Sequence, residues 1–221
     1  LSSKVLIVGM GGLGCPVAEF LTRSGIGTLG IADHDAVSLS NIHRQSLYNE
    51  KDINQSKVKI AKKKLNKINS KTKINIFNLK LNKNTFEKII KNYDYIVDGT
   101  DNFESKFLIN DLSLKYKKFL VTGAISKFDG HIFTFNFTNK KDPCLRCFYQ
   151  EETISDEILN CEYEGILGTV AGIIGTLQAN EVLKKILNIG QNLNGYILIL
   201  DLLNLNFRKA KINKRKKCLC N

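Results

Sequence analysis

The sequence predicts an α/β fold in which a mainly parallel β-sheet carries helices on both faces and is extended by antiparallel strands in the C-terminal half. Up to about residue 123, short apolar runs alternate with amphipathic segments, as in a parallel sheet whose strands are each followed by a helix. The pattern then changes, and residues 131–137 alternate in a way that indicates an added antiparallel strand. The chain has 221 residues, 43% of them hydrophobic, which is enough for one sizeable core.

Five strands are expected in the first half, each a short apolar run of the kind found in buried parallel strands. They cover residues 5–8, 28–32, 73–78, 95–97 and 119–122. The helices between them are predicted by apolar residues at helical spacing. They cover residues 15–24, 57–68, 85–91 and 103–116. On the first helix, Val17, Phe20 and Leu21 are expected to face the core. On the second, the inward residues are Val58, Ala61, Leu65 and Ile68.

The second half is expected to begin with the strand at 131–137. Residues 148–163 are polar and lack periodicity, so they are interpreted as a mobile crossover loop. A long helix with a glycine-rich first half is predicted over 165–187, followed by a closing hairpin of strands 196–201 and 205–212. We see no internal repeat and no linker between domains, so a single domain is expected.

The net charge of the chain has two interpretations. Lys and Arg outnumber Asp and Glu by 33 to 21, which gives a formal charge of +12. Basic surfaces attract nucleic acid, but an AT-rich genome also enriches lysine. The lysines are scattered rather than set in one stripe, so we expect no nucleic-acid partner. No apolar run is long enough to span a membrane. We therefore expect a soluble protein without a membrane partner, in the cytoplasm or, if the composition is organellar, in a stroma or matrix.

A glycine-rich turn is predicted between the first strand and the first helix, with Gly9, Gly11, Gly12 and Gly14. Such a turn places backbone N–H groups and a helix N-terminus against a phosphate. Asp33 follows the second strand, about 20 residues beyond the last glycine, where a carboxylate can bind a ribose. The pair predicts a Rossmann-like nucleotide site. A nicotinamide dehydrogenase is the default for this pattern, and a glycine-rich turn without a ligand is the other alternative.

The residues after Asp33 favour a triphosphate over a nicotinamide. They supply Asn41, Arg44 and Gln45, with Lys57 farther along. Arginine can clamp a phosphate with two hydrogen bonds, and lysine supplies a point charge. Asp101 follows the fourth strand and could hold Mg²⁺, which prefers carboxylate and phosphate oxygens. The neighbouring residues Asp35 and Asn102 complete the set of candidate cofactor-binding residues.

Four of the six cysteines form two close pairs, Cys144 with Cys147 and Cys218 with Cys220. The first pair has the spacing of half a structural zinc site. The second pair is one residue tighter than the usual Cys-x-x-Cys, which strains the geometry of a metal site. Such pairing indicates a metal site, and two unconnected pairs of free thiols are the alternative.

Taken together, these motifs resemble those of the MoeB/ThiF/HesA family, bacterial relatives of ubiquitin-activating enzymes, and most of all its MoeB-like members. The matching segments run through nearly the whole chain in the order of the family. They are GMGGLGCP at 9–16, DHDAVSLSNIHRQ at 33–45, Lys57, DGTDN at 98–102, PCLRC at 143–147 and GIIGTLQ at 172–178. The resemblance implies a single ThiF-type adenylation domain over 1–221. Its nucleotide-binding half would be 1–123, and 124–221 would be the antiparallel extension with the crossover loop and the zinc site. In the family a second cysteine pair near the C-terminus completes four thiolates, so the resemblance implies structural zinc bound by Cys144, Cys147, Cys218 and Cys220.

The activity implied by the resemblance is ATP-dependent adenylation of the C-terminal glycine of a ubiquitin-like sulfur carrier that ends in Gly-Gly, before sulfur transfer in molybdopterin or thiamine biosynthesis. Asp33 would bind the ribose and Asp101 would position Mg²⁺. The phosphates would be bound by Asn41, Arg44, Gln45 and Lys57. A homodimer is implied, and a sulfurtransferase or a cysteine desulfurase is a further partner. The alternatives are a non-catalytic subunit of a heterodimeric activating enzyme and a nucleotide-binding oxidoreductase.

Two further expectations come from the resemblance. In ThiF-like members a cysteine at the place of Cys161 is implicated in a persulfide link with the carrier, and the alternative is a spectator thiol. Members of the family usually carry N-terminal helices that contribute an arginine to the ATP site of the neighbouring subunit. Here the first strand begins near residue 4, so we expect either a fragment or an incomplete site.

Overall fold

The fold is built on one mixed β-sheet of eight strands. The computed structural model describes residues 2–149 and 165–220, and in these ranges the strand order is β3-β2-β1-β4-β5-β6-β7-β8. The first five strands are parallel, and β6, β7 and β8 are added antiparallel to the edge of β5. The strands are β1 Lys4–Val8, β2 Thr28–Ala32, β3 Lys73–Phe77, β4 Tyr95–Asp98, β5 Phe119–Ser126, β6 Asp129–Asn136, β7 Tyr196–Asp201 and β8 Asn206–Lys211.

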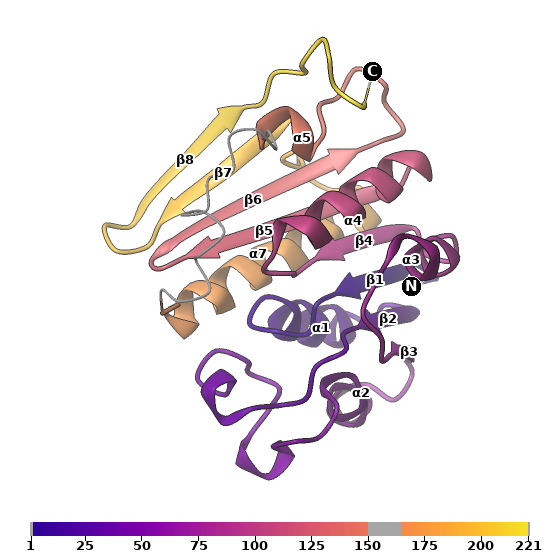
Figure 1. Ribbon diagram of the computed structural model, residues 1–221, viewed down its shortest axis with the longest axis vertical. Coiled ribbons are helices and arrows are strands. Elements are labelled where there is room, and N and C mark those ends of the chain that lie inside the picture. The colour runs from indigo at the N-terminus through magenta and orange to yellow at the C-terminus, as the bar shows by residue number, and fades with distance from the viewer. Residues whose placement is uncertain (1, 150–164, 221) are drawn as a thin grey trace.

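Helices cover both faces of the sheet (Figure 1). One layer consists of α1 Gly14–Arg23, α2 Lys57–Ile68 and α7 Gly168–Leu187. The other consists of α3 Lys83–Ile90, α4 Phe103–Lys115 and the one-turn helix α5 Leu145–Phe148. Two short 3₁₀ helices, Leu39–Asn41 and Glu50–Asp52, lie in the connection between β2 and α2.

Strand β1 shows why the first apolar run is continuous. Val5 and Ile7 pack into the core beneath α1, α2 and α7, while Leu6 and Val8 pack into the core beneath α3 and α4. Successive side chains of a strand point to opposite faces. The covered part of such a strand must therefore be apolar at every position, as residues 5–8 are, whereas Lys4 at the start of β1 is exposed.

The α/β prediction is confirmed, with the mainly parallel sheet, the helices on both faces and the antiparallel extension all present. Strand β5 is longer than expected, because its last residues pair with the start of β6 up to the Ser126–Asp129 pair. Helix α7 begins at Gly168 rather than 165.

Three details of the sequence prediction were wrong. Phe20 is 43% exposed and does not face the core, unlike Val17 and Leu21. Helix α5 and the two 3₁₀ helices were not predicted, and Phe148, assigned to the crossover loop, ends α5. The rest of that loop prediction, residues 150–163, lies outside the described residues.

The order of the strands locates the site. Strand β1 lies between β2 and β4, so the chain leaves β1 in one direction along the sheet for β2 and β3 and returns to its other side for β4. Ligands of open α/β sheets bind in the crevice that forms at such a reversal, beyond the carboxyl ends of the strands. In the parts of the chain that are described, we find no helix long and apolar enough to cross a membrane.

Candidate nucleotide site and cysteine cluster

The glycine turn joins β1 to α1, and its backbone packs closely against the backbone of the loop that follows β4. Gly9 has a φ of +89°, and a Cβ there would lie 2.7 Å from the carbonyl oxygen of Gly99, beyond β4. A Cβ on Gly14 would lie 1.9 Å from the carbonyl oxygen of Gly9. Both positions therefore require glycine for the turn to close and to touch the end of β4. A Cβ on Gly11 would make only ordinary contacts, so this part of the turn is open toward a ligand.

Asp33 fixes the glycine turn from the end of β2. Its Oδ2 accepts a hydrogen bond from the backbone N–H of Met10 (2.7 Å), and its Oδ1 accepts one from the N–H of Asp35 (2.8 Å). Each carboxylate oxygen can accept two hydrogen bonds. The side chain therefore holds the turn and still has acceptor capacity for the hydroxyl groups of a ribose.

The connection from β2 to α2 folds back on itself and brings Lys57 to Asp35. The backbone N–H of Val37 donates to the carbonyl of Gln55 (2.9 Å), and the N–H of Asn54 donates to the carbonyl of Val37 (2.9 Å). The N–H of Lys57 donates to the carbonyl of Asp35 (3.0 Å), and its Nζ donates to Oδ2 of the same residue (2.8 Å). The Lys57 side chain is only 5% exposed, so its ammonium group is oriented before any ligand arrives.

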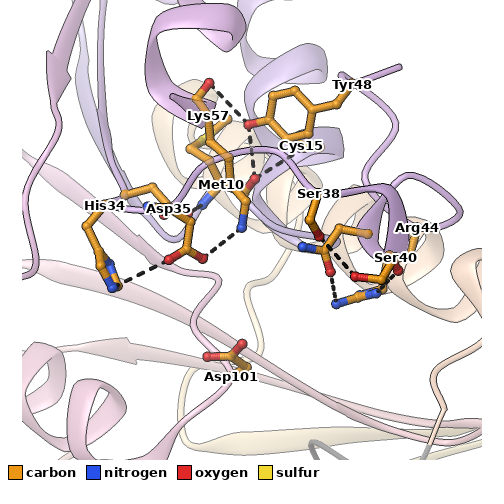
Figure 2. Close-up of polar contacts among 12 residues, drawn as sticks. Met10, Cys15, His34, Asp35, Ser38, Ser40, Arg44, Tyr48, Lys57 and Asp101 are labelled. Atoms are coloured by element: carbon orange, nitrogen blue, oxygen red, sulfur yellow. Dashed lines mark hydrogen bonds and ion pairs between the residues drawn. The ribbon is translucent and has the colours of Figure 1, made fainter. Parts of the chain in front are cut away.

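Asp35 is the present partner of that ammonium group. Burial raises the pKa of its carboxyl group, but the hydrogen bond and the charge of Lys57 lower it more, and the net pKa lies below the usual range. Nε2 of His34 lies 3.4 Å from the other carboxylate oxygen. Figure 2 shows this chain of contacts from His34 through Asp35 to Lys57. Asp35 thus acts as a counter-ion that an anionic ligand could replace.

Arg44 is held on the opposite side of the turn by the first 3₁₀ helix. Its Nη2 donates to Oδ1 of Asn41 (2.7 Å). Its Nη1 donates to the carbonyl of Ser40 (3.2 Å), and Figure 2 shows these two residues side by side. The guanidinium group has five N–H donors, so these two bonds orient it and leave donors for a ligand. Its Cγ would be 3.5 Å from a Cβ on Gly12. Arg44 therefore lies against the glycine turn.

Gln45 lies beside Arg44 and is nearly inaccessible, with 3% of its surface exposed. Its Nε2 would lie 3.7 Å from a Cβ added to Gly11, and its Oε1 has no hydrogen-bond partner among the described residues. A buried amide oxygen without a partner is unfavourable. The structure thus brings Asn41, Arg44 and Gln45 together against the turn.

Asp101 and Asn102 follow β4, on the neighbouring loop. Asp101 is exposed, and its Oδ1 accepts a hydrogen bond from Nδ2 of Asn102 (3.3 Å). Oδ1 of Asn102 accepts from the N–H of Ser105 (2.9 Å) and so caps α4. In Figure 2 no contact joins Asp101 to the other residues drawn. Asp101 therefore has a free carboxylate edge at the crevice, while the amide oxygen of Asn102 is engaged in the cap.

Two residues of this region carry no recognisable signal in the sequence. The Tyr48 hydroxyl lies within hydrogen-bond distance of the carbonyls of Met10 (3.1 Å) and Lys57 (3.3 Å), and so connects the turn to α2. Burial raises the pKa of this hydroxyl. The thiol of Cys15 donates to the same Met10 carbonyl (3.5 Å), and burial raises its pKa to about 12. Cys15 is therefore a buried neutral thiol.

The four paired cysteines meet in one cluster. All four Sγ atoms lie within 4.8 Å of one another, and the Cys144–Cys218 and Cys147–Cys220 sulfur distances are both 3.5 Å. Four sulfurs around a tetrahedral zinc, with Zn–S bonds of about 2.3 Å, are about 3.8 Å apart. The tighter spacing of the second pair does not prevent it from reaching the first.

Helix α4 supports the first cysteine pair. The N–H of Leu145 donates to Oδ1 of the buried Asn110 (2.9 Å). Arg146 makes two hydrogen bonds of 2.8 Å to the Asp111 carboxylate and lies over the ring of Phe107. Such outer contacts fix the orientation of a metal-binding turn. The same helix has Asp101 beside its N-terminus.

A cavity of about 370 Å³ opens next to Arg44, lined also by His43, Phe128, Gly165, Ile166 and Leu167. Its walls are apolar apart from the two basic side chains. The predicted reactive residue Cys161 lies outside the described residues, which resume at Gly165.

Comparison with known proteins identifies similar chains. The ThiF family model matches residues 1–221. The sulfur carrier protein adenylyltransferase of Thermus thermophilus is 34% identical over 98% of this chain and 81% of its own length. The probable molybdopterin-synthase adenylyltransferase of Porphyra purpurea is 44% identical over 95% of this chain, which spans only 55% of that relative.

Solved structures give a consistent fold. The crystal structure of E. coli MccB with ATP superposes with a TM-score of 0.86, covering 99% of this chain and 66% of that one, at 23% identity. At this identity the likeness concerns the fold alone.

Proposed function

The chain belongs to the ThiF family, and from this premise we propose that it is an ATP-dependent adenylyltransferase of the MoeB/ThiF type. Its substrate would be the C-terminal glycine carboxylate of a small ubiquitin-like sulfur carrier that ends in Gly-Gly. The names of the relatives support the activity and the class of substrate. The observation that carries the proposal is the pair of oriented cations, Arg44 and Lys57, on two sides of a glycine turn.

The reaction joins two anions. A carboxylate oxygen of the carrier attacks the α-phosphorus of ATP, the bond from that phosphorus to the α–β bridging oxygen breaks, and pyrophosphate leaves with the electron pair. The products are an acyl adenylate and pyrophosphate. No protein nucleophile is needed, so the protein contributes by positioning and by stabilising negative charge.

The geometry suggests how ATP would lie. The ribose would contact the remaining acceptors of Asp33, and the phosphates would approach the N-terminus of α1. Arg44 and Lys57 would bind the phosphates together with Asn41 and Gln45. Since Asn41 already orients Arg44 and Asp35 already orients Lys57, little ordering is needed when ATP binds.

Asp101 would hold Mg²⁺ at the same edge of the sheet. Its exposed carboxylate, on a loop that touches the glycine turn through Gly99, is suited to a hard cation. When bound, Mg²⁺ neutralises charge on the phosphates. Asn102, whose Oδ1 caps α4, would be a further cofactor-binding residue of this loop.

The cysteine cluster would hold a structural zinc ion. Cys144, Cys147, Cys218 and Cys220 offer four sulfurs at the spacing that tetrahedral zinc requires. Four thiolates leave no open position for a substrate, so the role would be structural. The ion would tie the C-terminal segment to the turn that packs on α4.

Further parts of the proposal concern the whole protein. We propose one adenylation domain, with 1–123 as its nucleotide-binding half and 124–221 as the extension that carries the crossover loop and the zinc site. It would act as a homodimer in molybdopterin or thiamine biosynthesis, in the cytoplasm or an organellar stroma or matrix. Cys161 would take part in sulfur transfer, with a sulfurtransferase or a cysteine desulfurase as sulfur donor.

ATP–pyrophosphate exchange tests the activity directly. We expect the purified protein to exchange labelled pyrophosphate into ATP when a MoaD-like or ThiS-like carrier is added. The matched control is the same carrier without its terminal glycine, which should support no exchange. Absence of exchange with both kinds of carrier, in protein that binds ATP, would contradict the proposal. Preferential binding of NAD over ATP would instead support an oxidoreductase.

A further inference from the structure

The loop that carries Asp101 is anchored by a carboxylate that the proposed reaction does not use. Asp98 ends β4 and is completely buried. Its Oδ1 accepts hydrogen bonds from the N–H (2.9 Å) and the hydroxyl (2.6 Å) of Thr100, the residue before Asp101. These two bonds define the turn between the end of β4 and the candidate Mg²⁺ ligand.

Lys106 is the cation that balances Asp98. Its Nζ donates to Oδ2 of Asp98 (3.1 Å) and to the carbonyl oxygen of Gly123 on β5 (2.6 Å). The Lys106 side chain is 5% exposed, so both charges of the pair lie inside the protein. The pair thereby connects α4 to the end of β4 and to the middle of β5.

Helix α7 also contacts Asp98, from the other face of the sheet. Nε2 of Gln178, on α7, donates to the carbonyl oxygen of Asp98 (2.8 Å). A Cβ on Gly123 would lie 2.7 Å from the Gln178 amide group, so this contact requires glycine there. Strands β4 and β5 and helices α4 and α7 therefore all meet at Asp98.

A buried ion pair is a costly way to stabilise a fold. Removing two charges from water costs several kcal/mol per ion, and apolar replacements are often at least as stable. A geometric role explains such a pair better, since charged hydrogen-bond partners fix a loop more narrowly than apolar contacts do. The loop fixed here is the one that ends in Asp101.

We propose that Asp98, Lys106 and Thr100 are positioning residues that hold Asp101 where it binds the Mg²⁺ of Mg·ATP. The inference rests on the proposed function, because it takes Asp101 as the ligand. None of the three residues would touch the nucleotide or the metal ion. Their contribution would be a single orientation of the loop before ATP arrives.

The test measures how strongly Mg²⁺ promotes ATP binding, without any carrier protein. Calorimetry gives the dissociation constant of ATP without added Mg²⁺ and with saturating Mg²⁺. The first constant divided by the second is the factor by which Mg²⁺ strengthens ATP binding, and this ratio reports the Mg²⁺ site. Asp101→Asn sets the ratio expected when the ligand is lost. We expect Lys106→Met to lower the ratio about tenfold, the usual effect of removing an outer partner of a metal ligand. In the double variant with Asp101→Asn, Lys106→Met should lower it no further.

Lys184→Met is the matched control. Lys184 pairs with Glu181 near the end of α7 and is 22% exposed, so its loss removes an ion pair without touching the loop. Its ratio should equal that of the wild type. If Lys106→Met does not fold, Thr100→Val replaces it, since this change removes only the hydroxyl bond to Asp98.

Hydrogen exchange of the nucleotide-free protein supplies a second readout. The amides of Gly99, Thr100 and Asp101 should exchange faster in Lys106→Met than in Lys184→Met. A folded Lys106→Met or Thr100→Val with the wild-type ratio would overturn the inference and leave the proposed function intact. A wild type whose ATP binding ignores Mg²⁺ would overturn the role of Asp101 and the inference with it.

Discussion

Arg44 illustrates how one side chain is prepared for a charged ligand. Asn41 and Ser40 hold its guanidinium group by two hydrogen bonds, so the rotamer is selected by the 3₁₀ helix before it. A free arginine loses side-chain entropy when it binds phosphate. Here Arg44 is already ordered in the folded protein, so its interaction with phosphate is not offset by that entropy loss. The interaction can then stabilise the charge that develops in the transition state.

Replacing Arg44 should therefore affect the rate more than the fold. We expect Arg44→Ala to lower the rate of ATP–pyrophosphate exchange about 100-fold or more, as for other preorganised donors, with little change in melting temperature. Arg23→Ala is the control, because Arg23 is an exposed arginine paired with Glu19 on α1. Near-normal exchange by Arg44→Ala would remove Arg44 from the catalytic set.

At the scale of elements, the connection between β2 and α2 depends on Asp52. Oδ2 of Asp52 accepts from the N–H of Asn49 (2.9 Å) and pairs with Lys64 on α2. These contacts join the second 3₁₀ helix to α2, whose first residue is Lys57. The position of Lys57 at the site thus depends in part on a carboxylate of the second 3₁₀ helix.

Acid should weaken this anchor in a defined range. Burial raises the pKa of Asp52, but the hydrogen bond from Lys64 and the N–H of Asn49 lower it more, so the net pKa lies below its usual value. A lowered folded-state pKa gives stability that is complete above the unfolded value of about 3.9 and is lost as pH falls through the folded value.

The comparison of Asp52→Asn with the wild type measures this contribution. At neutral pH the variant should be less stable by about 1.5–3 kcal/mol, the range for hydrogen bonds to charged groups. The difference should shrink as the pH falls below about 4. Denaturant unfolding at several pH values gives both quantities. Glu19→Gln, in an exposed pair with Arg23, should cost much less. A difference that is independent of pH would show that the charge of Asp52 contributes nothing.

At the scale of the whole molecule, the cysteine cluster joins the C-terminus to the sheet. Cys218 and Cys220 follow β8. Cys144 directly precedes α5 and Cys147 lies within it, and α5 packs on α4. The segments are more than 70 residues apart in sequence. A metal ion that binds only the folded arrangement of all four thiolates stabilises the fold by its binding energy.

Zinc removal should thus lower thermal stability. Protein purified without chelators should contain stoichiometric zinc by metal analysis. If removal of zinc by a chelator lowers the free energy of unfolding by about 3 kcal/mol, the melting temperature of a chain of this size should fall by about 6–12 °C. Added Zn²⁺ should restore the melting temperature, and added Mg²⁺ should not. Protein without zinc, and indifferent to chelators, would contain two pairs of free thiols instead.

The formal charge of +12 also belongs to this scale. Arg44 and Lys57 account for a specific part of it at the candidate site. Many other lysines are scattered over the helices and strands, where they make surface pairs such as Lys115 with Glu87. An acidic carrier would be attracted by such a surface.

The amino-acid sequence by itself determined the strands, the glycine turn and the residues that line it. A strand segment that is buried on both faces is apolar at successive positions, and a turn that packs against another backbone needs glycine at the contact. Both features can be recognised in a short stretch of sequence. Helix α5 was missed because a single turn is too short to show helical periodicity. The exposure of Phe20 was missed because an apolar pattern does not show how far the core extends.

The tertiary structure alone decided which distant groups meet. Asp98 and Gln178 lie in motifs that the sequence analysis singled out, but nothing in the sequence indicated that they and Lys106 meet, through contacts that join residues up to 80 positions apart. Tyr48 likewise reaches Met10 only because the connection after β2 folds back on itself. The tight second cysteine pair predicted strain, yet its sulfurs reach the first pair. Local preferences fix elements, whereas buried polar groups take the partners that packing brings to them, and that packing depends on the whole chain.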